Sequence, residues 1–380
     1  MTPFNRSYIT DKEIEYIKDS ILRGRISGDG YYTQKCQDFI ENTFKTKKAL
    51  LTTSCSSALD MAGILLDLKE GDEVIMPSFT FVSTANAVVL RGATPVFAEI
   101  NEETLNIEPM EIKKRITKNT KAIFPVHYAG VSCEMDEIMN LAGIYNLKVV
   151  EDAAQGVNSK YKEKYLGTIG DIGCYSFHET KNYVCGEGGA ILINKDDELA
   201  RRAEIIREKG TNRSQFFRGE VDKYTWVDIG SSFLPSDILA ALLWAQLEKL
   251  EEIRLKRKMV YEAYYEGLAR LQDEGILKLP VIPKDCESNY HIFYLLLNSD
   301  WERNTLMDTL KAKGVQAVFH YIPLHTSPMG QKLGYQKGDL PVTEHISDRL
   351  LRLPIYPDLS LDEIKYIIAI ISDFFNKPRY

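Results

Sequence analysis

Two apolar, strand-like segments end in polar side chains that are able to do chemistry. The run "VVEDAAQ" ends at Asp152 and Gln155, and the run "CYSFHETK" ends at Ser176, His178 and Lys181. In a parallel sheet the carboxyl ends of neighbouring strands meet at one edge, and ligands bind beyond that edge. We therefore expect the Lys181 amine and the Asp152 carboxylate to face one ligand site.

A predicted helix start and an aromatic residue belong to the same expected edge. The segment "LLTTSCSSAL" passes from a strand into a helix at Ser54 and Cys55, and "IMPSFTF" delivers Phe81 to the same rim. Backbone N–H groups at the beginning of a helix bind phosphate well, because they lack partners within the helix. An aromatic face can hold a planar ring by stacking.

Each of these residues also has an ordinary structural interpretation. A loop lysine is usually solvated, Asp152 can cap the next helix, the serines can form a simple N-cap, and Phe81 can belong to the core. Together, however, they match the needs of pyridoxal 5'-phosphate (PLP): an amine for a Schiff base, a carboxylate for the pyridine nitrogen, an aromatic face and a phosphate cradle. We therefore expect PLP on Lys181, with burial lowering the pKa of this amine.

The order of the apolar runs predicts the elements that position these residues. Strand-like runs begin at residues 72, 94, 120, 147, 171 and 188 and are separated by helical stretches such as 55–68 and 81–92. This alternation predicts an α/β fold with a mostly parallel sheet covered on both faces. Residues 236–271 read as one long bridging helix. With 380 residues, 44% of them hydrophobic, we expect two domains: a large one over 1–250 and a small α+β domain over 251–380.

Composition argues against several other classes of protein. A net charge of -7 lacks the basic footprint of nucleic-acid binders. We find no apolar run long enough to span a membrane and no secretory signal, and we expect a cytoplasmic protein with six free, mostly buried cysteines. His127, His320 and His325 lack the carboxylate spacing of a metal site, so we expect no metal.

The chain resembles the StrS/DegT-type sugar aminotransferases, which are PLP enzymes of the aspartate aminotransferase fold (PLP fold type I). The likeness rests on "GDEVIMPSFTFVSTANAVVLRGATPVFAEI", "VVEDAAQ", "GCYSFHETKN" and "GEGGAI", and it extends over nearly the whole chain. It implies roles for individual residues: Lys181 as Schiff-base lysine and proton shuttle, and Asp152 as partner of the ring nitrogen. The remaining implied cofactor contacts are Gln155 to the ring hydroxyl, Phe81 by stacking, and Ser54, Cys55 and Ser176 to the phosphate.

The resemblance also implies a substrate and a partner. Such enzymes are homodimers with active sites at the subunit interface. Ser232 of "GSSFL" stands where many relatives have an asparagine that reaches the partner's phosphate. The implied reaction moves the amino group of L-glutamate to C4 of a dTDP-4-keto-6-deoxyglucose. Candidate substrate contacts are His178, Arg213, Tyr321 and His325.

Several alternatives stay open at this stage. Amination at C3, a gluco-configured product, a sugar dehydratase and a non-enzymatic regulator share the fold, although Lys181 argues against the dehydratase. The basic residues near the middle of the chain fit either a pyrophosphate site or a solvated face: Arg207, Lys209, Arg213, Arg218 and Lys223. Enterobacterial common antigen and an O-antigen sugar are equally compatible destinations.

Overall fold

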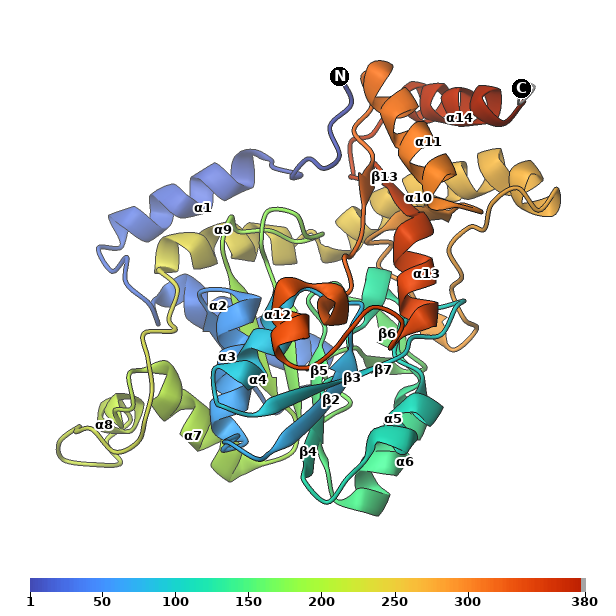
Figure 1. Cartoon of the computed structure of the whole chain (residues 1–380). Helices are drawn as coiled ribbons and strands as arrows, with labels where there is room; N and C mark the ends of the chain where they lie inside the picture. Colours follow the sequence, from blue (N-terminus) through green and yellow to red (C-terminus); the bar gives the residue numbers. More distant parts are fainter. Residues whose placement is uncertain (377–380) are drawn as a thin grey trace.

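A seven-stranded sheet forms the centre of the larger part of the molecule. The structure, a computed structural model, describes residues 1–376. The strand order is β1-β9-β8-β5-β4-β2-β3 (Figure 1). The strands are β1 (Lys48–Thr52), β2 (Glu73–Pro77), β3 (Thr94–Ala98), β4 (Thr120–Ile123), β5 (Lys148–Asp152), β8 (Ile172–Ser176) and β9 (Gly189–Ile193). Only β9 runs antiparallel to its neighbours, β8 and β1, so the predicted mostly parallel sheet is confirmed.

Helices cover both faces of this sheet, as the continuous apolar runs predict. Successive strand side chains point to opposite faces: Val149 packs in the hydrophobic cluster on one side, and Val150 packs in the cluster on the other. The first face is covered by α2 (Tyr31–Phe44), α5 (Pro109–Arg115), α6 (Met135–Tyr145) and α9 (Asp237–Leu247). The second face is covered by α3 (Cys55–Leu65), α4 (Val82–Val89) and α7 (Asp197–Arg207).

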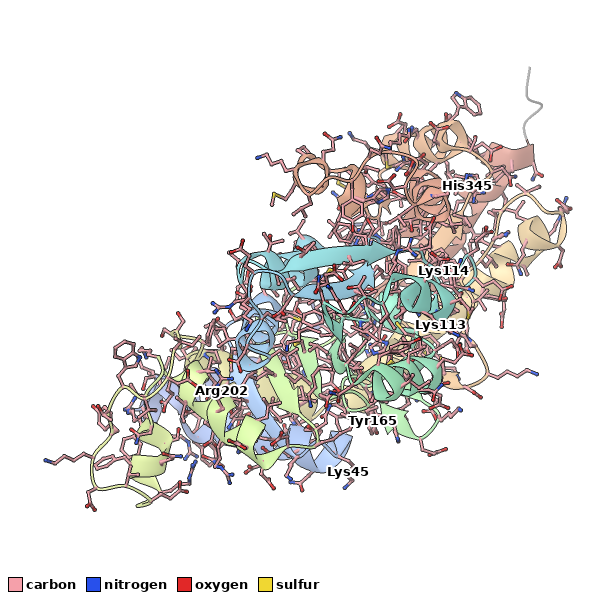
Figure 2. The ribbon with its side chains drawn as sticks, turned by 60° about the horizontal axis from the view of Figure 1, so that its bottom comes forward. Lys45, Lys113, Lys114, Tyr165, Arg202 and His345 are labelled. Carbon is pink, nitrogen blue, oxygen red and sulfur yellow. The ribbon has the colours of Figure 1, made fainter. Side chains whose placement is uncertain are left out.

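The C-terminal part has a hydrophobic core of its own, drawn from residues between Val260 and Ile371. Its elements are α10 (Leu250–Asp273), β11 (Phe293–Leu296), α11 (Asp300–Ala312), β12 (Val318–Phe319), α12 (Pro328–Lys332), α13 (Pro341–Arg349), β13 (Leu350–Leu353) and α14 (Leu361–Asn376). This separate core supports our proposal of a second domain over 251–380, of which residues 377–380 lie outside the described part. In Figure 2, His345 of this part and Lys45 of the large part lie at opposite ends of the molecule.

The two parts meet through a fourth hydrophobic cluster. Phe79 and Tyr128, which follow strands of the large sheet, pack with Tyr294 and Ile346 of the C-terminal part. Smaller elements complete the chain: α1 (Asp11–Leu22), α8 (Arg213–Phe217), the three-stranded sheet of β6 (Lys160–Tyr161), β7 (Lys164–Tyr165) and β10 (Cys286–Glu287), and two 3-10 turns, Tyr128–Gly130 and Leu324–Thr326. All six cysteines are free, and all but Cys286 are buried, as predicted.

The predicted single helix over 236–271 is wrong, because the chain turns between α9 and α10. The helices end at Leu247 and begin again at Leu250, and Lys249 between them is not helical. The buried Lys249 amine donates hydrogen bonds to the Thr10 hydroxyl, at 2.8 Å, and to the Glu13 carboxylate. The turn lets α9 pack against α1 and α2 while α10 packs against α14. This polar anchor comes from the far N-terminus, so the local helical pattern did not reveal it.

Glu13 is therefore expected to stabilise the junction of α1, α9 and α10. It is buried, accepts the backbone N–H of Thr10 at 2.8 Å, and is bonded to Lys249. A Glu13→Ala variant leaves the Lys249 amine buried without its carboxylate. We expect the free energy of unfolding to fall by about 3 kcal/mol in urea denaturation at neutral pH. The exposed Glu15→Ala on the same helix is the control, and equal losses in both variants would contradict this role.

The stabilisation by Glu13 should also depend on pH. Burial alone raises the pKa of this carboxyl, but hydrogen bonds from Lys249 and Thr10 outweigh burial and lower it. A carboxyl with a lowered folded-state pKa stabilises the fold above its unfolded pKa, and this contribution is lost as the pH falls. The stability difference between the wild type and Glu13→Ala should be complete above about pH 5 and shrink on acidification.

Candidate active site at the carboxyl edge of the sheet

The structure brings several of the predicted site residues to one edge of the large sheet. Asp152 is the last residue of β5, and Ser176 is the last residue of its parallel neighbour β8. Because β9 is antiparallel to β8, the connection over residues 177–188 leaves and re-enters the sheet at this same edge. Lys181 lies in this connection, where its backbone N–H donates to the carbonyl of His178 at 2.9 Å. The predicted convergence of the amine and the carboxylate at one edge is thus explained by strand direction.

Asp152 is held in a fixed orientation by hydrogen bonds to both of its carboxylate oxygens. The residue is 5% exposed. Its Oδ2 accepts the Thr84 hydroxyl at 2.7 Å, and its Oδ1 accepts the backbone N–H of Ala154 at 3.2 Å. The Thr84 hydroxyl also contacts the Thr80 hydroxyl at 2.8 Å. A buried carboxylate with such donors is pre-organised to accept one further proton-bearing group, such as a pyridinium nitrogen.

A second buried acid supports the strand that carries Asp152. The carboxylate of Glu151 accepts the backbone N–H groups of Gly167, Ile169 and Gly170 at 2.8, 2.7 and 2.6 Å. The same carboxylate lies 2.9 Å from the Nε2 of His127, and both side chains are fully buried. His127, which we considered as a metal ligand, therefore belongs to the support of β5. Its backbone N–H also donates to the carbonyl of Asp152 at 3.1 Å.

The environment of Lys181 favours a reactive amine. Burial lowers the pKa of this lysine, the positive charge of Arg352 adds to the shift, and the carboxylate of Asp152 opposes it. Burial keeps the neighbouring Cys55 thiol protonated by raising its pKa. A lowered pKa makes the neutral amine accessible, and a neutral amine is the form that attacks an aldehyde. The direction of this shift agrees with the prediction from the sequence.

The beginning of α3 forms a cradle next to this amine. Ser54 is the N-cap of α3, and its hydroxyl accepts the Ser57 N–H at 3.0 Å. Residues of the first turn leave N–H groups without partners in the helix, and these attract an anion. Gly189 at the start of β9 is required here, because a Cβ at this position would collide with the backbone of Ser54 and Cys55. Ser176 is buried at the neighbouring strand end.

Gln155 links the sheet edge to the C-terminal part. Its Oε1 accepts the backbone N–H of Ala129 at 2.7 Å, and its Nε2 donates to the Tyr321 hydroxyl at 3.1 Å. The Tyr321 ring lies 6.5 Å from the ring of Phe81, measured between centroids. Phe81 is 57% exposed at the beginning of α4, so its face is available for stacking. His178 lies in the Lys181 connection, and its Nδ1 is 2.9 Å from the Thr180 hydroxyl.

Three predicted residues lie apart from this cluster or are engaged elsewhere. His325 is fully buried, with its Nδ1 2.7 Å from the Ser78 hydroxyl and its Nε2 2.9 Å from Glu344, so both ring nitrogens are already used within the fold. Arg213 and Ser232 are exposed on the segment that carries α8, where Arg213 lies 3.7 Å from Glu208 and Ser232 forms an isolated β-bridge with Glu208. Ser232 precedes Phe233, whose carbonyl accepts the backbone N–H of Thr53 at 2.9 Å. In Figure 1 this segment protrudes at the side of the molecule, away from α13.

The basic residues of the middle segment do not form one patch. Arg207 is buried and donates to Gln37 at 2.9 Å and to Asp29 at 2.6 Å, so it serves the fold. Arg218 pairs with Glu220 at 2.7 Å and with Glu204 at 2.9 Å. Two of the candidate pyrophosphate-binding residues, Arg207 and Arg218, are therefore already engaged within the fold.

The sequence analysis did not identify two residues that lie near the site. Thr84 lies one helical turn after Phe81, and this helical spacing is the signal in the sequence that could have identified it. Arg352 lies on β13, and its charge influences both Lys181 and Tyr321. Nothing in its local sequence marks it, because only the packing of the two parts brings it near.

Comparison with known proteins gives the family of this fold and site. The model of the DegT/DnrJ/EryC1/StrS aminotransferase family matches residues 7–372. The chain belongs to this family. This aminotransferase is 36% identical to "Uncharacterized protein MJ1066" of Methanocaldococcus jannaschii, over 100% of the chain and 98% of that protein. It is 32% identical to GDP-perosamine synthase of Escherichia coli O157:H7, over 98% of both proteins.

A solved structure extends this likeness to the bound cofactor. Spr1654 from Streptococcus pneumoniae in its PLP form matches with a TM-score of 0.90 and 25% identity, over 98% of both chains. The aminotransferase therefore has the fold of PLP-dependent aminotransferases and binds PLP through a Schiff base to a lysine, as predicted. Within residues 1–376, no helix is both long and apolar enough to cross a membrane.

The contact between Thr84 and Asp152 should matter for cofactor binding. A Thr84→Val variant keeps the size of the side chain and removes the hydroxyl donor from a buried carboxylate. A lost hydrogen bond to a charged group costs about 1.5–3 kcal/mol, so we expect PLP affinity to fall about tenfold or more. Absorbance titration of the apo protein with PLP measures this change. Thr84→Ser keeps the donor and should bind PLP nearly normally; wild-type affinity in Thr84→Val would refute the contact's role.

Proposed function

We propose that this aminotransferase moves the amino group of L-glutamate to C4 of dTDP-4-keto-6-deoxyglucose, giving dTDP-4-amino-4,6-dideoxygalactose and 2-oxoglutarate. The observation that carries the proposal is the meeting of Lys181 and Asp152 at one sheet edge in a member of a sugar aminotransferase family. The similarity to GDP-perosamine synthase supports a nucleotide-linked sugar as acceptor. The choice of dTDP, C4 and the galacto configuration rests on the sequence resemblance.

The residues of the site have distinct proposed tasks. PLP supplies an electron sink that stabilises negative charge at the reacting carbon. Lys181 would carry the cofactor, remove the proton from the α-carbon of the donor in the first half-reaction, and deliver a proton to the sugar carbon that receives the amine in the second. Its lowered pKa suits a group that alternates between base and acid. Asp152, held by the Thr84 hydroxyl, would keep the ring nitrogen protonated.

Further residues would orient the cofactor and the substrate. The first turn of α3, at Ser54 and Cys55, and the hydroxyl of Ser176 would hold the phosphate. Gln155 would contact the ring hydroxyl, and Phe81 would stack on the ring. For the sugar we retain His178 and Tyr321, which lie beside these groups. We leave His325 out of the proposed contacts, because both of its ring nitrogens are occupied.

Asp152 and Lys181 provide the direct test of this assignment. Lys181→Ala should abolish the absorption band of lysine-bound PLP. Asp152→Ala should keep the fold but reduce turnover by about 100-fold or more. Incubation with dTDP-4-keto-6-deoxyglucose and glutamate, followed by NMR of the ring couplings, identifies the position and configuration of the new amine. Near-normal turnover of Asp152→Ala would contradict the proposed role of Asp152. Ring couplings of a product aminated at C3, or of a gluco-configured product, would show that the proposed product is wrong.

We also propose that the protein is a homodimer whose active sites lie at the subunit interface. The segment around α8 exposes several large apolar side chains, including Phe217 at 66% and Trp226 at 76%. Phe81, at the rim of the site, is similarly exposed. Apolar surface of this kind on a protruding segment is typical of an interaction surface. Arg213 and Ser232 lie on this segment, so in a dimer they would act on the partner's site rather than their own.

The dimer has its own test. A Phe217→Glu, Trp226→Glu double variant places two charges on the exposed apolar surface. Light scattering coupled to gel filtration should show a dimer for the wild type and a monomer for the variant. The matched control is Leu361→Glu, Tyr366→Glu on α14, which changes two exposed apolar residues elsewhere and should remain dimeric. A monomeric wild type would contradict the proposed assembly.

A further inference from the structure

An arginine on the small sheet lies on the side that faces the active site. Arg352 is in the middle strand, β13, opposite Tyr294 on β11 and Val318 on β12. Directly opposed residues of neighbouring strands share one face of a sheet. The Tyr294 ring lies 6.2 Å from the ring of Tyr128, which belongs to the large part. Arg352 is therefore on the face of the small sheet that is turned towards the large one.

The protein leaves the charge of Arg352 without a matching anion. Its guanidinium donates one hydrogen bond, from Nη2 to the carbonyl of Phe319 at 3.3 Å, and lies 4.7 Å from the ring centroid of Phe4. Its Nε is buried and has no acceptor, and within residues 1–376 no carboxylate forms an ion pair with it. Burial lowers the pKa of this guanidinium. A partly buried cation without a counter-charge is costly, so the site favours an anionic ligand.

Contacts lead from Arg352 directly to the cofactor residues. Its acceptor, Phe319, is followed along the chain by His320 and Tyr321. The Tyr321 hydroxyl accepts from Gln155 at 3.1 Å, and the Nδ1 of His320 is 3.1 Å from the Tyr128 hydroxyl. Burial lowers the pKa of His320, and the charges of Arg352 and Lys181 lower it further. A group bound by Arg352 would thus be close to whatever reacts at Lys181.

We propose that Arg352 binds a carboxylate of the amino donor; this assignment rests on the proposed transamination. The planar guanidinium fork fits a carboxylate through paired N–H···O bonds. Another anion, the cofactor's phosphate, has its own cradle at the beginning of α3. The proposed dTDP-linked keto sugar carries no carboxylate, and its pyrophosphate is the competing anion for a guanidinium. On this assignment Arg352 serves the half-reaction with the donor and not the half-reaction with the sugar nucleotide. Arg352 would position the donor so that its α-carbon meets the Lys181 amine.

Single-turnover kinetics of the two separate half-reactions test this assignment. The PLP-loaded protein is mixed with L-glutamate alone, and the loss of the cofactor's absorption band is followed. Arg352→Gln should lower the specificity constant of this half-reaction about 100-fold, as expected when a charged pair is broken. The second half-reaction, from the aminated cofactor to the keto sugar, should change about threefold or less. Arg352→Lys keeps the positive charge but loses the planar guanidinium. Its specificity constant for glutamate should lie between those of the wild type and Arg352→Gln.

A binding measurement adds a readout that does not depend on turnover. Glutarate, a dicarboxylate without an amine, should bind to the wild type in calorimetry and bind much more weakly to Arg352→Gln. The matched control is Arg349→Gln on α13, where the guanidinium contacts the carbonyls of His345 and Leu297. This control should keep both glutarate binding and the glutamate half-reaction. Thermal unfolding and PLP absorbance confirm that each variant is folded and loaded.

The outcomes separate this assignment from the proposed function. An unchanged glutamate half-reaction in Arg352→Gln, or an equal loss in both half-reactions, overturns the assignment. Failure of the wild type with the keto sugar refutes the proposed acceptor but leaves the glutamate comparison intact. If the wild type does not react with glutamate, the proposed donor is wrong. L-Alanine and L-glutamine are then used as donors in the same comparison. A slower donor half-reaction in Arg352→Gln, with the sugar half-reaction unchanged, supports the carboxylate contact, and an unchanged donor half-reaction overturns it.

Discussion

The direction of three neighbouring strands is the constraint on which the site depends. β5 and β8 are parallel, so Asp152 and Ser176 end at the same edge, and β9 returns antiparallel, so the connection that carries Lys181 stays at that edge. Because β9 is reversed, the whole connection over residues 177–188 stays at this edge. Gly189 at the start of β9 lets α3 approach the same point.

The two reactive groups at this edge are controlled in different ways. The pKa of Lys181 is lowered because burial removes water from the amine and Arg352 adds a positive charge nearby, while Asp152 opposes the shift. Asp152 is instead held in one orientation by two donors, a hydroxyl from Thr84 and a backbone N–H from Ala154. An amine that readily loses a proton beside an oriented carboxylate is the combination that PLP chemistry needs.

The C-terminal part completes this site rather than merely covering it. Tyr321 reaches Gln155, and Arg352 brings an uncompensated cation to the side that faces the large sheet. The polar anchor of Glu13 and Lys249 sets the turn between α9 and α10, and α10 carries the chain into the small core. The position of Arg352 is thus linked to a junction that the N-terminal helix helps to fix.

The sequence by itself determined the sheet and the helices on both of its faces, because apolar periodicity is local. It also determined that Lys181 and Asp152 lie at one edge, because the carboxyl ends of parallel strands meet there. Only the tertiary structure decided the turn at Lys249, the engagement of His325 with Ser78 and Glu344, and the place of Arg352. These depend on contacts between residues distant in the chain, where a side chain's partners follow from packing and leave no periodic trace in the sequence.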